Sequence, residues 1–247
     1  MEDDRKIFEK NRNAKILALE SDEDLFKKST ELVIQLDKYN YTYLWSWMGV
    51  PIIQMPADIM ATQEVIWKCK PDIIIETGVA RGGSVLMLAS FLKLIGGRKV
   101  IGVDIDIRDH NRESIENHFM GEYVELIEGP STSIETIDKV KTHIKSDDRI
   151  MVVLDSDHSY EHVLKELNLY APLINEGGYL IVADTLLGFL SDEQTPRERS
   201  QILYKGNEPR SAVENYVKET DRFELDKEIN GKLVLASSPY GFYKCVK

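Results

Sequence analysis

Short apolar runs that alternate with stretches of helical periodicity are the feature that most constrains how this 247-residue chain folds. Each run is apolar on both faces, which is typical of strands in a parallel sheet that helices cover on both sides. The runs are Asp72–Glu76, Lys99–Asp104, Tyr123–Ile127, Ile150–Asp155 and Gly178–Ala183, with helices expected near 84–95, 111–119, 131–145 and 159–173. The alternation predicts a doubly wound α/β sheet.

The C-terminal segment departs from this pattern. Arg222–Glu228, Lys232–Ala236 and Phe242–Val246 are predicted to be short strands. Ile229-Asn230-Gly231 predicts a hairpin turn between the first two, because Asn-Gly tolerates positive φ. An antiparallel ending on a parallel sheet is unusual for a nucleotide-dependent dehydrogenase, so the pattern disfavours that class.

The N-terminal segment is polar and charge-mixed, with apolar residues at loosely helical spacing that predict one or two amphipathic helices within residues 1–40. The next segment, Tyr39–Trp47, has an aromatic ring at every second position. Such density indicates either a buried staple or the wall of a pocket, and the sequence leaves both open. We therefore expect an N-terminal helical and aromatic cap over residues 1–50 and a main domain over 51–247.

Composition excludes several classes of protein. The chain has 31 Lys and Arg against 42 Asp and Glu, a formal charge of −11, whereas a nucleic-acid binder needs a basic face. Cys69 and Cys245 are the two cysteines and form no CxxC pair, which argues against a disulfide framework or a zinc ribbon. The charged start and the lack of a long apolar run predict a cytoplasmic protein with no membrane partner.

Ligands of doubly wound sheets bind beyond the carboxyl ends of the strands, where the strand order reverses. The first run is followed there by a glycine-rich turn, Glu76–Ser84, that opens a helix. Gly78 and Gly82 allow the backbone to turn tightly and approach a ligand, although a turn alone also explains them. The spacing is not the GxGxxG of a dinucleotide site. The second run ends in Asp104, whose carboxylate can accept two hydrogen bonds from a ribose.

Polar residues also follow the later runs. Ser131, after the third run, is either a helix N-cap or a ligand contact. Asp155 and Asp157 follow the fourth run, and Asp184 follows the fifth. Clustered carboxylates repel one another, and a hard divalent ion such as Mg²⁺ relieves that repulsion through oxygen ligands. His158 lies within one turn of these acids and is placed to act as a base, while capping of the next helix also explains Asp157.

These residues lie in stretches of sequence that resemble a known protein family. Residues 51–188 resemble the cephalosporin hydroxylase family, which is related to macrolide-sugar and rhamnosyl O-methyltransferases. The matching stretches are Pro51–Pro56 (PIIQMP), Glu76–Ser84 (ETGVARGGS), Ile101–Arg112 (IGVDIDIRDHNR), Leu154–His162 (LDSDHSYEH), Gly177–Thr185 (GGYLIVADT) and, further on, Arg222–Lys227 (RFELDK). The resemblance implies the α/β, Rossmann-like fold of a class I S-adenosylmethionine (SAM) methyltransferase, a mostly parallel seven-stranded sheet that ends in an antiparallel hairpin.

The resemblance also implies a role for each matching position. Expected cofactor contacts are Glu76, Gly78, Gly82, Ser84, Asp104, Gly129, Ser131 and Asp155. Gly78 and Ser84 would hold the methionine part of SAM, Asp104 the ribose, and Gly129 with Ser131 the surroundings of the adenine. Asp155 and His158 are the implied catalytic residues, with His158 at the position of the basic lysine of catechol O-methyltransferase.

Mg²⁺ is the metal that the resemblance implies, with Asp155 and Asp184 as its ligands. Relatives usually carry Glu-Asp where this chain has Ala183-Asp184, so one expected carboxylate is missing. Asp157, Thr185 or water is left to replace it.

The leading interpretation is a SAM-dependent, Mg²⁺-assisted O-methyltransferase that acts on a hydroxyl of a sugar or of a glycosylated small metabolite. The aromatic segment and the loop 186–210 are expected to close over that acceptor, and the aromatic patch with the helical N-terminus predicts a homo-oligomer. One alternative is a hydroxylase, as the family name suggests, which normally needs two histidines and one carboxylate around iron. Another is a non-catalytic SAM-binding subunit.

Overall fold

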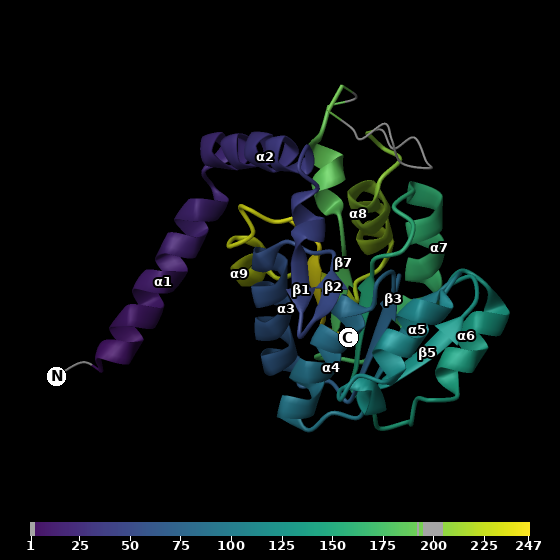
Figure 1. Ribbon diagram of the computed structural model, residues 1–247. Helices are drawn as coiled ribbons and strands as arrows, with labels where there is room; N and C mark the ends of the chain where they lie inside the picture. Colours follow the sequence, from purple (N-terminus) through teal and green to yellow (C-terminus); the bar gives the residue numbers. More distant parts are fainter. Residues whose placement is uncertain (1–2, 192, 195–204) are drawn as a thin grey trace.

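The protein is seen here in a computed structural model that describes residues 3–191, 193–194 and 205–247 (Figure 1). The helices are α1 (Asp4–Glu20), α2 (Glu23–Asp37), α3 (Pro56–Cys69), α4 (Gly83–Ile95), α5 (Asp109–Glu116), α6 (Ile134–Lys141), α7 (Tyr160–Tyr170), α8 (Pro209–Glu219) and α9 (Lys227–Asn230). Short 3₁₀ turns are η1 (Tyr41–Leu44), η2 (Gly121–Tyr123), η3 (Ala171–Leu173) and η4 (Thr185–Phe189). The strands are β1 (Trp45–Trp47), β2 (Val50–Ile52), β3 (Ile73–Thr77), β4 (Lys99–Asp104), β5 (Val124–Glu128), β6 (Ile150–Leu154), β7 (Tyr179–Val182), β8 (Phe223–Leu225) and β9 (Phe242–Cys245).

The central sheet has seven strands in the order β5-β4-β3-β6-β7-β9-β8. The five predicted apolar runs form its five parallel strands. Most strand ends differ from the predicted ends by one residue, and the others agree with them. The chain moves outward from β3 to β5 and then returns to place β6 on the other side of β3, so the strand order reverses between β3 and β6. The predicted fold class is confirmed, and the predicted ligand crevice belongs at the carboxyl ends of these two strands.

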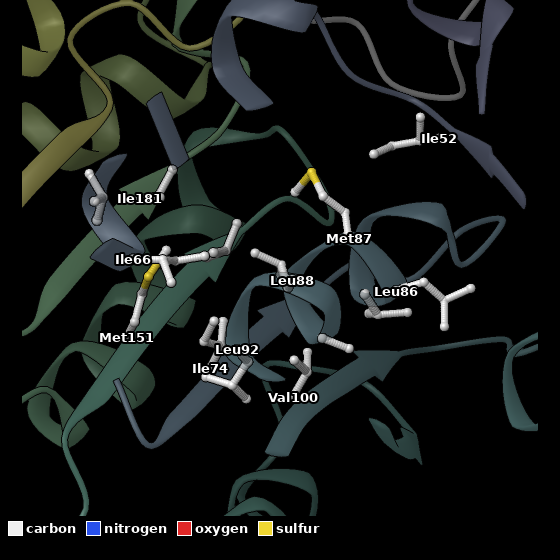
Figure 2. Packing of buried hydrophobic residues seen from close by; sticks show 14 of the residues in the cluster. Ile52, Ile66, Ile74, Leu86, Met87, Leu88, Leu92, Val100, Met151 and Ile181 are labelled. Atoms are coloured by element: carbon white, nitrogen blue, oxygen red, sulfur yellow. The ribbon is translucent and has the colours of Figure 1, made fainter. Parts of the chain in front are cut away.

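Each face of the sheet carries its own hydrophobic core. Side chains alternate along β3, so that Ile74 faces α3 and α4 while Ile73 and Ile75 face α6, α7 and α8. Figure 2 shows the first core, in which Leu88 and Leu92 of α4 lie against strand residues of the sheet. Helices on both faces explain why the parallel strands are apolar throughout.

The N-terminal segment forms the two predicted helices. α1 extends away from the body of the molecule, and α2 crosses one end of it (Figure 1). Ile16 is the buried residue of α1, whereas Phe8 is 67% exposed. The predicted boundary at residue 50 lies within a hairpin, because β1 pairs with β2. The homo-oligomer remains a prediction that these exposed apolar side chains motivate.

The aromatic segment has both of the roles that the sequence left open. Trp47 packs edge-on against Phe91, with ring centroids 5.3 Å apart, and its indole N–H donates to the Ser90 hydroxyl of α4. Tyr43, by contrast, is 53% exposed and lines a cavity described below. One end of the segment is therefore a staple and the other is a pocket wall.

The predicted Asn-Gly hairpin turn is wrong. Residues 227–230 form the short helix α9, and Lys232–Ala236 is not a strand. The Asp226 side chain caps the helix by accepting from the backbone N–H of Ile229, and Ile229 is fully buried. Asn230 is buried as well and donates to the carbonyls of Asp226 and Phe242. The antiparallel ending exists nonetheless, because β9 inserts antiparallel between β7 and β8.

We expect Asn230→Ala to destabilise the protein by about 2 kcal/mol, because it removes two buried side-chain hydrogen bonds and the oxygen that accepts from the buried Phe242 N–H. Lys227→Ala is the matched control, since Lys227 is exposed on the same helix and its loss should change stability by less than about 0.5 kcal/mol. Urea denaturation followed by fluorescence measures both. Equal stabilities of the two variants would contradict the buried position of Asn230 in α9 and would support the exposed hairpin turn predicted from the sequence.

Among the described residues, no helix is both long enough and apolar enough to cross a bilayer.

Candidate functional site

The glycine turn after β3 has a backbone that only glycine fits. Gly78 has φ of +91°, and a Cβ there would lie 2.0 Å from the carbonyl oxygen of Asp155. Gly82 has φ of +90°, and its Cβ would meet the Ile115 side chain at 2.5 Å. The tips of β3 and β6 are thus pressed together at the point where the strand order reverses. The N-terminus of α4 opens directly beside them.

Asp104 fixes this turn from the neighbouring strand tip. Its Oδ2 accepts from the backbone N–H groups of Val79 and Ala80 at 2.8 and 3.1 Å, and its Oδ1 accepts from Asp106 at 3.2 Å. Each carboxylate oxygen has two lone pairs, so capacity for a ribose hydroxyl remains. The predicted ribose contact stays a prediction, and the structure adds a second task, which is to hold the glycine turn in place.

Two adjoining cavities lie beyond the strand tips. The smaller, of about 300 Å³, extends from Gly82, Gly83 and Ser84 to Leu186, Leu187 and Leu190. The larger, of about 670 Å³, extends from Asp104 to Ser131 and His162. The residues that line both are Tyr43, Gly78, Ala80, Asp155, Ser156 and His158. The two cavities therefore meet at the tips of β3 and β6.

An imidazole and two carboxylates converge at this junction. His158 Nδ1 lies 3.0 Å from Asp184 Oδ2, and His158 Nε2 lies 3.5 Å from Asp155 Oδ1. One ligand atom from each residue lies within 4.8 Å of the others, which fits a single divalent cation. Burial raises the pKa of the Asp155 carboxyl, an effect that His158 opposes and the Asp184 charge strengthens. The sequence prediction that these three residues meet is therefore fulfilled in geometry, while their roles stay predictions.

The other two residues considered as metal ligands turn to local partners. The Asp157 carboxylate accepts from the backbone N–H and the hydroxyl of Ser159 at 2.8 and 2.6 Å, next to the start of α7. The buried Thr185 hydroxyl donates to the carbonyl of Pro239. Neither residue belongs to the three-residue cluster. Ala183 lines the smaller cavity and offers no side-chain ligand.

Glu76 lies fully buried below the glycine turn. Its Oε2 accepts from the Ser84 hydroxyl at 3.0 Å, and its Oε1 has no hydrogen-bond partner within the described residues. Burial and the nearby Asp155 charge hold the pKa of this carboxyl well above its ordinary value. A buried acid with a vacant acceptor beside Ser84, which lines the smaller cavity, fits a cofactor with a cationic group.

The raised pKa of Glu76 predicts a pH-dependent penalty on the cofactor-free protein. Between the ordinary pKa of 4.5 and the folded value, the folded protein holds a proton that the unfolded chain releases, so stability falls as pH rises. Glu76→Gln removes this dependence. The stability of wild type relative to the variant is expected to fall by up to about 1.4 kcal/mol per pH unit above about pH 5. Denaturant titrations from about pH 5 to 8 test this, with the exposed Glu161→Gln as control, and a pH-independent difference would contradict it.

Ser131 and Gly129 occupy different surroundings. Ser133, and not Ser131, caps α6, so the N-cap explanation of Ser131 is wrong. Ser131 instead lines the larger cavity, with its hydroxyl 3.1 Å from His162 Nε2. Gly129 is not among the lining residues, and a Cβ there would meet the Thr136 hydroxyl at 2.7 Å. Gly129 shapes the turn, while Ser131 presents the polar group.

Several lining residues were not named individually from the sequence, although three of them fall inside the predicted closing loop 186–210. Leu186, Leu187 and Leu190 follow the tip of β7, and Val33 with Ile34 of α2 line the same cavity. The apolar stretch directly after Asp184 was a usable signal, because apolar side chains beyond a strand tip need a partner. Of the predicted closing loop 186–210, residues 192 and 195–204 lie outside the described ranges, and the closure stays a prediction.

Comparison with known proteins decides the family. The model of the family described as rhamnosyl O-methyltransferase/CmcI matches residues 39–246. The chain belongs to this family. A rhamnosyl O-methyltransferase of Mycobacterium leprae is 30% identical over 170 residues, 66% of this chain and 72% of the relative. One from Mycobacterium tuberculosis H37Rv is 28% identical over 227 residues, 88% of this chain and 86% of the relative.

Solved structures agree with this family in their fold. CmcI with Mg and SAM has a TM-score of 0.56 at 19% identity and covers 83% of this chain and 78% of its own. An O-methyltransferase from Bacillus cereus with SAH has a TM-score of 0.53 at 17% identity, covering 80% and 81%. The predicted family, the class I fold and the enzyme class, a SAM-dependent methyltransferase, are confirmed.

Proposed function

We propose that this family member transfers the methyl group of SAM to a hydroxyl of a sugar or of a glycosylated small metabolite. The observation that carries the proposal is the meeting of two cavities at Asp155, His158 and Asp184. The cofactor can extend from the larger cavity across the junction to Ser84, and the acceptor can occupy the rest of the smaller cavity, so that the two touch at this junction. Relatives named rhamnosyl O-methyltransferases support a sugar hydroxyl as the acceptor.

The adenosine part of the cofactor lies in the larger cavity, and its methionine part crosses the junction to Ser84 at the glycine-turn end of the smaller cavity. Asp104 holds the ribose, and the turn at Gly78 lets the backbone approach the methionine part while Ser84 and Glu76 receive its cationic end. The acceptor enters the smaller cavity, where leucines after Asp184 and the α2 residues pack against its apolar parts. Exclusion of water from that cavity strengthens each electrostatic contact at the junction.

The reaction needs alignment and one proton acceptor. The acceptor oxygen attacks the methyl carbon, the carbon–sulfur bond breaks, and S-adenosylhomocysteine (SAH) leaves. With a hydrogen on Nδ1 directed at Asp184 Oδ2, 3.0 Å away, His158 takes the hydroxyl proton on Nε2. Alignment of oxygen, carbon and sulfur supplies much of the rate, because it replaces an encounter in solution by a fixed geometry.

A divalent cation fits the donor set at the junction. Asp155 and Asp184 would hold it through carboxylate oxygens, and a bound cation lowers the pKa of a coordinated hydroxyl and orients it. One carboxylate fewer than in relatives lowers the negative charge of the ligand set, so we expect Mg²⁺ to bind weakly. The described cluster has one imidazole and two carboxylates, the reverse of the set that iron hydroxylases use.

Turnover with a panel of acceptors tests the proposal. Purified protein, SAM and Mg²⁺ are incubated with methyl rhamnoside, a rhamnosylated phenol, a macrolide glycoside and catechol, and SAH formation is measured. SAH is expected with the glycosides. Absence of SAH binding in calorimetry would overturn the proposal, turnover of catechol alone would replace the acceptor class, and SAH binding without turnover of any acceptor would favour the non-catalytic subunit.

A further inference from the structure

A hydrogen-bonded cluster lies at one side of the larger cavity and has no part in the reaction proposed above. It consists of Ser131, Ser156, His162 and Glu166. His162 Nε2 lies 3.1 Å from the Ser131 hydroxyl, 3.2 Å from the Ser156 hydroxyl and 3.3 Å from Glu166 Oε1. The Ser156 hydroxyl donates to the same Glu166 oxygen at 2.7 Å. These contacts join the loops after β5 and β6 to helix α7.

The position of Glu166 is energetically unfavourable for a carboxylate. Its side chain is 0% exposed, and its Oε2 has no hydrogen-bond partner within the described residues. A buried carboxylate destabilises a protein unless a cation accompanies it. His162, one helical turn earlier, is the nearest candidate in this cluster. Burial opposes a charge on His162, but the Glu166 carboxylate outweighs burial and raises the pKa of the imidazole.

All of these contacts occupy one nitrogen of the imidazole. A hydrogen on Nε2 would face the Glu166 carboxylate and the two serine hydroxyls, and Nδ1 has no hydrogen bond in the described part of the chain. The His162 side chain is 27% exposed and lines the larger cavity together with Ser131 and Thr132. The cluster therefore holds the imidazole ring in one orientation at a cavity wall and leaves Nδ1 available there.

We propose that His162 recognises the adenine ring of the cofactor, with its Nδ1–H donating to the ring nitrogen N1, and that Glu166 is its positioning residue. This inference rests on the proposed use of SAM. Asp104, at the tip of β4, takes the ribose, so the adenine edge remote from the ribose is the edge left for Ser131 and His162. That edge carries N1, an acceptor, and the 6-amino group, a donor.

The proposed contact predicts discrimination between two purines. Hypoxanthine carries a hydrogen on N1 and an oxygen at position 6, so its N1–H would face the His162 N–H and repel it. We expect wild-type protein to bind SAH about 10- to 100-fold more tightly than S-inosylhomocysteine, the size of effect that loss of a hydrogen bond to a charged group produces. A pocket that reads the adenine by shape alone would not separate the two.

Calorimetric dissociation constants for SAH and S-inosylhomocysteine test this in four proteins. His162→Ala is expected to weaken SAH binding by about tenfold or more and to abolish the preference for SAH. Glu166→Gln is expected to reduce the preference and to raise the KM for SAM by more than it lowers kcat. His110→Ala is the matched control, because His110 is exposed on α5 and lines neither cavity.

The outcomes separate this inference from the proposed function. An unchanged preference in His162→Ala would overturn the adenine contact, while absence of SAH binding in wild type would overturn the proposed function instead. If His162→Ala does not fold, His162→Leu fills the same wall without any hydrogen-bond donor. Retention of the full preference in folded His162→Leu would likewise refute the contact.

Discussion

Replacing Gly78 by alanine is expected to abolish cofactor binding and to destabilise the protein by about 3 kcal/mol or more. Two costs add at this position. The added Cβ would lie 2.0 Å from the carbonyl oxygen of Asp155, and the backbone φ of +91° is one that L side chains rarely adopt. Since Asp155 lines both cavities, the shift that relieves the clash deforms the junction itself.

Gly96 supplies the matched control for this substitution. It has φ of +82° with no atom within 4 Å of a Cβ, so Gly96→Ala carries the backbone strain without the clash. We expect that control to lose about 1 kcal/mol and to bind SAH as wild type does. Thermal unfolding and calorimetry with SAH measure both variants. Comparable SAH affinity in the two would show that the contact with Asp155 is not what makes glycine necessary.

Asp184→Asn is expected to lower methyl transfer by about 1,000-fold while leaving SAH affinity within about threefold of wild type. The asparagine removes one of two carboxylates from the junction and weakens the acceptor for His158 Nδ1. Asp184 is not among the residues expected to hold SAM. Mn²⁺ binding, followed by electron paramagnetic resonance of the free ion, is expected to weaken by at least about tenfold. The exposed Asp109→Asn is the control.

The cation measurement also distinguishes two roles of His158. As a base, its replacement by alanine lowers turnover and leaves Mn²⁺ affinity close to that of wild type. As a ligand, its replacement weakens Mn²⁺ binding as strongly as Asp184→Asn does. Unchanged Mn²⁺ affinity in Asp184→Asn itself would remove Asp184 from the ligand set.

The parallel strands and the junction followed from local patterns in the sequence. Buried runs apolar on both faces have few alternatives to a covered parallel strand, and Asp155 and Asp184 converge because parallel strands end at the same edge. Asn230 is a position where local sequence patterns predict the wrong structure. Asn-Gly favours a hairpin locally, but the Asp226 cap and the burial of Ile229 between distant segments stabilise a helix instead. Those contacts are set by tertiary structure.

The site residues show the same division. Ser131 and Ser133 are equivalent as caps by residue type, and only the path of the backbone selects Ser133. The spacing of His162 and Glu166 places both on one face of α7, yet nothing in the sequence shows that Glu166 is buried or that His162 lines a cavity. The helix α8 was not found from the sequence, and its Ala212 and Val213 are fully buried.

The shared wall of the two cavities has a consequence for the binding of the two substrates. Because the loop after β6 belongs to both, through Asp155, Ser156 and His158, a molecule that occupies one cavity alters the surface offered by the other. Binding of the two substrates is then thermodynamically linked, and each changes the affinity for the other by the same factor. An acceptor that tightens SAM binding must itself bind more tightly to the SAM complex, by the same factor.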